Sequence, residues 1–124
     1  MVDVATVRRL ALAQDGAQDG SSEQVLTFAV GGKGFAWTYL ARETPKGRRL
    51  PHLEVLAVRC DLMRKEVLIE AAPDRFFDDD HYRGYPAVLV RLDKVAADEL
   101  TALLKSAWRL RAPKALVRRS DAEG

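Results

Sequence analysis

Two runs of alternating apolar and polar side chains, joined by a glycine-rich stretch, constrain the fold of this chain most strongly. The apolar positions of the two runs are Leu26, Phe28 and Val30, then Phe35, Trp37 and Tyr39. A period of two places alternate side chains on one face of a β-strand, so we expect each set of three to share a face. The linking residues 31–34 read Gly-Gly-Lys-Gly. They lack the spacing of a phosphate-binding loop and precede a strand, which predicts a hairpin turn.

The rest of the chain alternates between helical and extended patterns. The expected elements are a helix over 3–14, a strand over 53–60, a helix from the N-cap Asp61 to about 71, a strand over 87–92 and a long helix ending near Ala112-Pro113, with a short basic helix after it. The apolar positions expected in the core are Leu62, Val67, Leu68 and Ile69 of the first of these helices, and Leu100, Leu103, Leu104, Ala107 and Trp108 of the long one.

Three segments read as connections, because turn-forming residues replace the regular patterns. They are 15–22, 41–52 (which contains Pro45, Gly47 and Pro51) and 74–86. The order helix, three strands, helix, strand, helix favours an antiparallel sheet with the N- and C-terminal helices packed on one face. We therefore predict an α+β two-layer sandwich.

Length and composition indicate one globular domain. The chain has 124 residues, of which 48 % are hydrophobic and 31 % charged, enough to bury a core. We predict a single domain over 1–119 and a short flexible tail over 120–124. Cys60 is the single cysteine, which excludes an intrachain disulfide and a cysteine-based zinc site. No signal peptide is recognisable and no apolar run reaches the about 20 residues of a membrane span, so we expect a cytoplasmic protein.

The charges are nearly balanced but unevenly distributed. Lys and Arg number 20 against 18 for Asp and Glu, a net charge of +2 that argues against a polycation of the histone kind. Residues 42–49 nevertheless carry a net +3, and residues 105–119 carry six basic side chains without an acid. The rest of the chain therefore carries a net charge of −7. Lys and Arg clusters of this kind neutralise phosphates, so the two segments are candidates for nucleic-acid binding, and a solvated helix face is the alternative.

Several segments together resemble the MmcQ/YjbR family of small bacterial proteins. In chain order they are 30–36, 59–61, 73–77, the stretch 81–86 (His-Tyr-Arg-Gly-Tyr-Pro) with the strand at 88–93, and 107–114. The resemblance covers about residues 3–119. It implies a CyaY-like α+β fold, and the family usually carries the label DNA-binding protein. The chain departs from the family at 19–24, where members often have a Thr-Ser-Tyr-Gly-Thr-Pro-like segment, so a role tied to that loop is not carried over.

From the charge segregation and the resemblance we expect a non-enzymatic, sequence-tolerant DNA-binding protein that acts as a monomer and contacts double-stranded DNA. Aromatic and guanidinium groups in 81–85 would add closer contacts to the phosphate contacts of the basic segments. The candidate residues are Arg42, Lys46, Arg48, Arg49, Tyr82, Arg83, Arg109, Arg111, Lys114 and Arg118. The alternative is a protein- or small-ligand-binding module that uses Tyr82–Tyr85 and the C-terminal helix.

Metal binding and catalysis have weaker signals, and we expect neither a metal nor another cofactor. Four potential ligands stand in a row at 78–81, Asp-Asp-Asp-His, but such a run is more typical of a turn with an Asx cap. Frataxin-type relatives of the implied fold bind iron along an acidic first helix, whereas residues 3–14 have Asp3 as their single acid beside Arg8 and Arg9. Cys60, His52 and His81 form no recognisable nucleophile–base motif, and a lone cysteine on an apolar strand is typically a buried hydrophobe.

Overall fold

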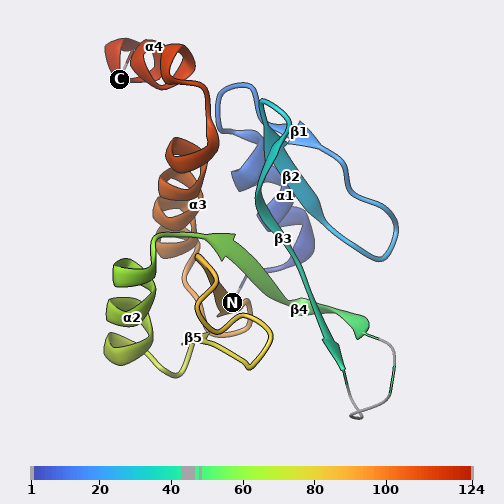
Figure 1. Cartoon of the computed structure of the whole chain (residues 1–124). Coiled ribbons are helices and arrows are strands. Elements are labelled where there is room, and N and C mark those ends of the chain that lie inside the picture. The colour runs from blue at the N-terminus through green and yellow to red at the C-terminus, as the bar shows by residue number, and fades with distance from the viewer. Residues whose placement is uncertain (1, 43–46, 48, 124) are drawn as a thin grey trace.

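The computed structural model describes residues 2–42, 47 and 49–123 (Figure 1). Its helices are α1 Val4–Leu12, α2 Leu62–Ala71, α3 Ala97–Arg111 and α4 Lys114–Glu123. Its strands are β1 Gln18–Asp19, β2 Thr27–Val30, β3 Lys33–Arg42, β4 Arg49–Arg59, β5 Phe76–Phe77 and β6 Ala87–Arg91. They form one sheet in the order β1-β2-β3-β4-β6-β5, and every neighbouring pair is antiparallel. The predicted α+β architecture is confirmed.

The glycine stretch forms the predicted hairpin turn between β2 and β3. Val30 pairs with Lys33, and Gly31 and Gly32 have φ angles of 58° and 79°. L-residues rarely adopt such angles, which explains glycine at both positions. A Cβ at Gly31 would lie 3.2 Å from the Pro113 side chain, so the turn packs closely against the link between α3 and α4.

A β-bulge changes the predicted faces of β3. Ala29 pairs with Gly34 and Phe28 with Ala36, which leaves Phe35 as an extra residue. Phe35 and Ala36 are therefore both buried in the main core, whereas Trp37 and Tyr39 pack in a second cluster around Val55, Ala57, Tyr82, Ala87 and Leu89. The prediction that Phe35 shares a face with Trp37 and Tyr39 was wrong, because the bulge shifts the alternation by one residue.

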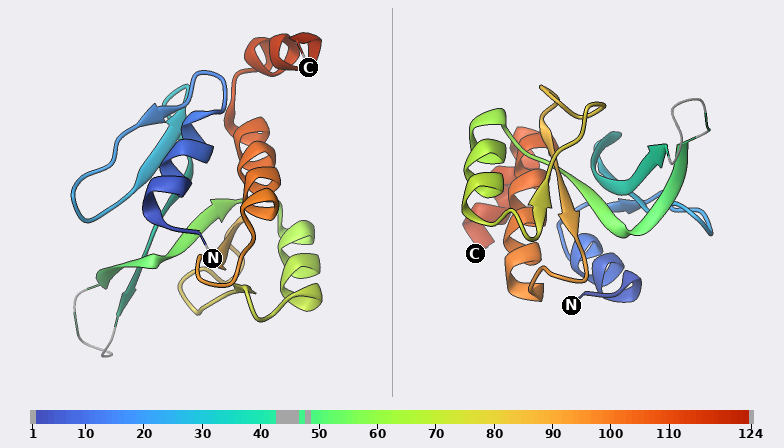
Figure 2. Two further views of the ribbon diagram at one scale, coloured as in Figure 1. Left: turned by 180° about the vertical axis from the view of Figure 1, so that it is seen from behind. Right: turned by 90° about the horizontal axis from the view of Figure 1, so that it is seen from below.

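The main core lies between the sheet and its helices. Helices α1 and α3 lie on the same side of the sheet in both views of Figure 2, as the sequence predicts for the terminal helices. The predicted stripe of α3, from Leu100 to Trp108, is buried throughout. Trp108 is 1 % exposed and its indole N–H donates to the Asp15 carbonyl oxygen at 2.7 Å, tying α3 to the segment after α1.

The β3–β4 hairpin is longer than the sequence predicts. Within the expected connection 41–52, β3 continues to Arg42 and β4 begins at Arg49, with Leu40 opposite Pro51. Proline is tolerated there because β6 pairs only with the Val55–Arg59 part of β4, so within the described residues this end of β4 has no second partner strand to receive an N–H bond. The short strands β1 and β5 were also missed, since they lie in segments rich in turn-forming residues.

The remaining differences concern α2 and α4. Leu62 and Val67 were expected in the core but are 47 % and 59 % exposed, and the inward side of α2 instead carries Lys65, Leu68 and Ile69. Residues 120–123, expected to form a short tail, are the last residues of α4. No helix in the described part of the chain is long and apolar enough to cross a membrane.

Candidate nucleic-acid interface

Basic side chains from four elements converge beside the C-terminal end of α3. We call this set the basic surface: Arg59 of β4, Arg64 of α2, Arg109 and Arg111 of α3, and Lys114 and Arg118 of α4. Three shallow hollows connect them. One of about 190 Å³ lies between Arg64 and Arg109, one of about 220 Å³ between Arg59 and Arg111, and one of about 300 Å³ among Arg109, Lys114 and Arg118.

Local sequence explains why these elements meet. Asp61 caps α2 by accepting a hydrogen bond from the Arg64 N–H at 2.7 Å, which starts the helix directly after β4. Ala112 has an extended backbone, φ −68° and ψ 147°, as expected before a proline. The chain therefore leaves α3 and begins α4 in a new direction, which Figure 1 shows at the top of the molecule. Lys114 and Arg118 are exposed on this helix.

Asp121, which follows the basic segment 105–119, offsets part of the positive charge of that segment. Arg109 pairs with Asp121 of α4, with Nη1 to Oδ1 at 2.6 Å and Nη2 to Oδ2 at 3.3 Å. The hydrogen bonds of this pair lower the pKa of Asp121 and raise that of Arg109. Arg111 differs, because its Nε is buried and has no hydrogen-bond partner within the described residues.

The structure brings together four of the predicted nucleic-acid residues and places four others elsewhere, and the remaining two lie outside the described residues. Arg109, Arg111, Lys114 and Arg118 belong to the basic surface. Arg42 pairs with Arg49 in the backbone register at the far end of the β3–β4 hairpin, which lies at the opposite end of the molecule from α4 in Figures 1 and 2. Lys46 and Arg48 lie outside the described residues.

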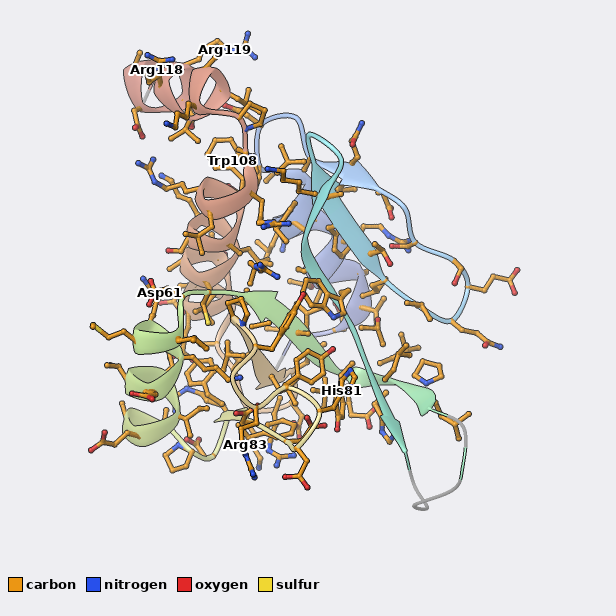
Figure 3. All side chains as sticks on the ribbon, viewed as in Figure 1. Asp61, His81, Arg83, Trp108, Arg118 and Arg119 are labelled. Atoms are coloured by element: carbon orange, nitrogen blue, oxygen red, sulfur yellow. The ribbon has the colours of Figure 1, made fainter. Side chains whose placement is uncertain are left out.

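Arg83 and Tyr82 belong to the loop that precedes β6. Arg83 is exposed, forms an ion pair with Asp80 at 2.7 Å and lies far from Arg118 in Figure 3. Tyr82 is only 7 % exposed, and its hydroxyl accepts a hydrogen bond from the Trp37 indole N–H at 3.0 Å. Tyr82 is therefore packed within the second cluster and does not project from the surface as a contact to DNA.

Next to the basic surface lies a hollow with aromatic walls, which we call the aromatic pocket. It has a volume of about 390 Å³ and is lined by Trp37, His81, Tyr82 and Tyr85. The Tyr85 ring stands nearly perpendicular to those of Trp37 and Tyr82, at 76° and 80°. The Arg59 guanidinium lies 5.1 Å from the centroid of the Tyr85 ring and donates to its hydroxyl at 2.8 Å. Arg59 thus borders both the pocket and the basic surface.

A buried lysine holds the loop that forms this pocket. Lys65 of α2 is 3 % exposed, and its Nζ donates to the carbonyl oxygens of Tyr82 and Tyr85 at 2.7 and 3.0 Å. The same Nζ pairs with the Asp78 carboxylate at 3.0 Å. These three contacts replace the hydration of the ammonium group and fix the two tyrosines relative to α2.

Sequence reasoning missed Arg59 and Arg64, and it considered Tyr82–Tyr85 and Trp37 as ligand-binding residues without joining them in one pocket. Arg59 is the last residue of a buried strand and Arg64 lies three residues after an N-cap, so neither stands in a charge cluster of the sequence. The aromatic residues of 81–85 were visible in the sequence. Trp37, which completes the lining of the pocket, comes from β3, and only the fold brings it next to them.

The acidic run and His52, which were considered for metal binding and catalysis, have other partners. Among the described residues no group of three or more His, Cys, Asp and Glu side chains could hold a metal ion. In the acidic run, Asp78 pairs with Lys65, Asp79 accepts from the Tyr82 N–H and the Tyr39 hydroxyl, and Asp80 pairs with Arg83. His52 contacts Glu54. Cys60 is buried, which raises the pKa of its thiol to about 11.

These features define a small α+β protein with a basic surface at its C-terminal helices and an aromatic pocket on the sheet face that the helices leave open. Residues 10–110 match the protein-family description YjbR. The chain belongs to the YjbR family, as its ordered motifs predict.

The chain is also similar to two mycobacterial proteins and to one solved structure. The uncharacterized proteins Mb2600 of Mycobacterium bovis and MT2646 of Mycobacterium tuberculosis are each 37 % identical to the chain over 95 residues, covering 71 % of this chain and 74 % of theirs. The crystal structure of Deinococcus radiodurans protein DR2400, with a domain described as DUF419, has a TM-score of 0.65 and 23 % identity. That likeness covers 89 % of this chain and 78 % of that one, and it supports the fold.

Proposed function

We propose that this protein binds DNA through the basic surface and acts as a monomeric, non-enzymatic binding protein in the cytoplasm. The observation that carries the proposal is the convergence of six Lys and Arg side chains from β4, α2, α3 and α4 around connected hollows. The whole chain has a net charge of only +2, so this concentration reflects where the charges lie rather than their total number.

The basic surface has the chemistry of phosphate binding. Guanidinium and ammonium groups replace condensed counterions on the DNA backbone, and the release of those ions drives association. Phosphate contacts carry no sequence information directly, so the expected binding is tolerant of sequence. The ends of β3 and β4 at Arg42 and Arg49 lie at the opposite end of the molecule, and we therefore assign the main contact to the C-terminal helices.

Charge reversal on α4 tests the proposal. Lys114→Glu/Arg118→Glu should weaken binding to a labelled duplex in fluorescence anisotropy by at least tenfold at low salt, and equally for unrelated sequences. The matched control is Arg9→Glu/Lys94→Glu, which changes the net charge equally but places the changes in α1 and before α3. The proposal fails if the wild-type protein does not bind duplex at about 50 mM salt, or if both double variants lose affinity to the same extent.

A second candidate function is the binding of a small planar ligand without DNA, and the aromatic pocket is the observation that favours it. A thermal-shift screen against a panel of metabolites distinguishes the two. A reproducible rise in melting temperature with one compound, together with no binding to DNA, would favour the small-ligand function.

A further inference from the structure

The aromatic pocket and the basic surface share a border at one side chain. Arg59 lines the same hollow as Arg111 and also stacks on Tyr85, which lines the aromatic pocket. A phosphate bound between Arg59 and Arg111 would therefore lie beside the aromatic rings. Asp61 lines the same hollow, and its Oδ1 accepts the Arg64 N–H as the N-cap of α2. Nucleic acid offers this combination of groups, because each phosphate is linked through a sugar to a planar base.

The pocket is organised before any ligand arrives. Its Tyr82 and Tyr85 backbone carbonyls are held by Lys65, the indole N–H of Trp37 is bonded to the Tyr82 hydroxyl, and Arg59 holds the Tyr85 hydroxyl. Tyr85 nevertheless remains 41 % exposed, so part of its ring is open to a partner. Ring faces of this kind stack with any nucleobase, and each stacked base contributes about 1–3 kcal/mol in proteins that bind single strands.

We propose that the aromatic pocket accepts one unpaired base of DNA whose backbone lies on the basic surface beside Arg59. This inference rests on the proposed DNA-binding function and deepens it. A base inside an intact duplex has both faces covered by its neighbours, so it enters the pocket only from a single strand, a bulge or a frayed end. The protein should therefore prefer DNA with an unpaired base to a perfect duplex of the same length.

The charges around the pocket favour a base over a cationic guest. Perpendicular tyrosine and tryptophan rings also suit a quaternary ammonium group, but such a group would meet the Arg59 guanidinium on Tyr85. Of the three acids in the same loop, Asp78 and Asp80 are paired with Lys65 and Arg83, and Asp79 accepts hydrogen bonds from the Tyr39 hydroxyl and the Tyr82 N–H. A neutral planar base is not repelled by the Arg59 guanidinium, and the anionic phosphate linked to it is attracted by that group.

The test compares three labelled DNAs of equal length: a duplex, the same duplex with one unpaired base, and a single strand. Fluorescence anisotropy of the wild-type protein should give affinities at least about fivefold higher for the single strand and the bulged duplex than for the perfect duplex. In Tyr85→Leu this preference should disappear. Val67→Ala, which removes an exposed apolar side chain from α2, should retain it.

Tryptophan fluorescence provides a second readout. The chain has two tryptophans, and Trp108 is 1 % exposed, so quenching on DNA addition reports Trp37. The single strand should quench this emission, and Trp37→Phe should abolish the quenching.

The outcomes separate the inference from the proposed function. Equal affinities for all three DNAs without quenching would overturn the base pocket and leave DNA binding by the basic surface intact. Absence of binding to every DNA at low salt would overturn the proposed function and the base pocket with it. Quenching by the single strand combined with the expected preference supports both.

Discussion

Lys65 shows how one residue can connect an element of the fold to the candidate site. Its position in α2 falls on the same side as Leu68, Ile69 and Ala72, which pack toward the main core. A prediction of core positions from apolar residues alone does not include a lysine. It predicts that Leu62 and Val67 are buried, but both are exposed. The buried ammonium group is stable there because two carbonyl oxygens and Asp78 surround it.

Replacing this lysine should be costly. Lys65→Met keeps much of the side-chain volume but leaves two carbonyl groups and Asp78 without their cation, so we expect a loss of about 3 kcal/mol in the free energy of unfolding. Urea unfolding followed by circular dichroism measures this loss. The control Lys105→Met, at an exposed position of α3, should change stability by less than about 0.5 kcal/mol. Equal urea unfolding midpoints for the two variants would show that Lys65 does not stabilise the loop that contains Tyr82 and Tyr85.

Cys60 should make stability fall in alkaline solution. Burial raises the pKa of its thiol from the ordinary 9.0 to about 11, so the native state keeps the proton between these values while the unfolded chain loses it. Since the native state then binds more protons, the free energy of unfolding decreases as the pH rises from 9 to 11. The difference in stability between the wild-type protein and Cys60→Ala isolates this contribution. A difference that stays constant across this pH window would contradict the raised pKa.

At the scale of elements, regular periodicity was enough to predict most of the fold. The stripe of α3, the glycine hairpin and the order of helices and long strands all follow from local patterns. The bulge at Phe35 could not be predicted, because it depends on pairing with β2. The same holds for Pro51 within β4, which is tolerated because the next strand does not reach that part of β4.

The contact between α3 and α4 should restrain DNA binding. Asp121 holds Arg109 in an ion pair, so Asp121→Asn should free a guanidinium for phosphate and steepen the slope of log affinity against log salt by about 0.9. Asp98→Asn makes the same charge change in the first turn of α3 and should leave the slope unchanged. A slope in Asp121→Asn equal to that of the wild-type protein would indicate that Arg109 does not contact DNA.

At the scale of the whole molecule, the structure resolves a question that charge counting leaves open. The described ends of the first basic segment, where β3 ends at Arg42 and β4 begins at Arg49, lie at the opposite end of the molecule from α4 (Figure 1). Charge segregation alone identified Arg109, Arg111, Lys114 and Arg118. Arg59 and Arg64 join them only through the fold, because β4 ends and α2 begins beside the C-terminal half of α3.

The most direct test of the account is a duplex titration across a salt series with charge reversals at the two ends of the molecule. We predict that log affinity falls linearly with log salt, and that Lys114→Glu/Arg118→Glu reduces the magnitude of the slope by about two. Arg42→Glu/Arg49→Glu, at the hairpin end, should have a clearly smaller effect on both affinity and slope. Affinity that is independent of salt, or that is lost in the hairpin variant and kept in the α4 variant, would contradict the assignment of DNA binding to the basic surface.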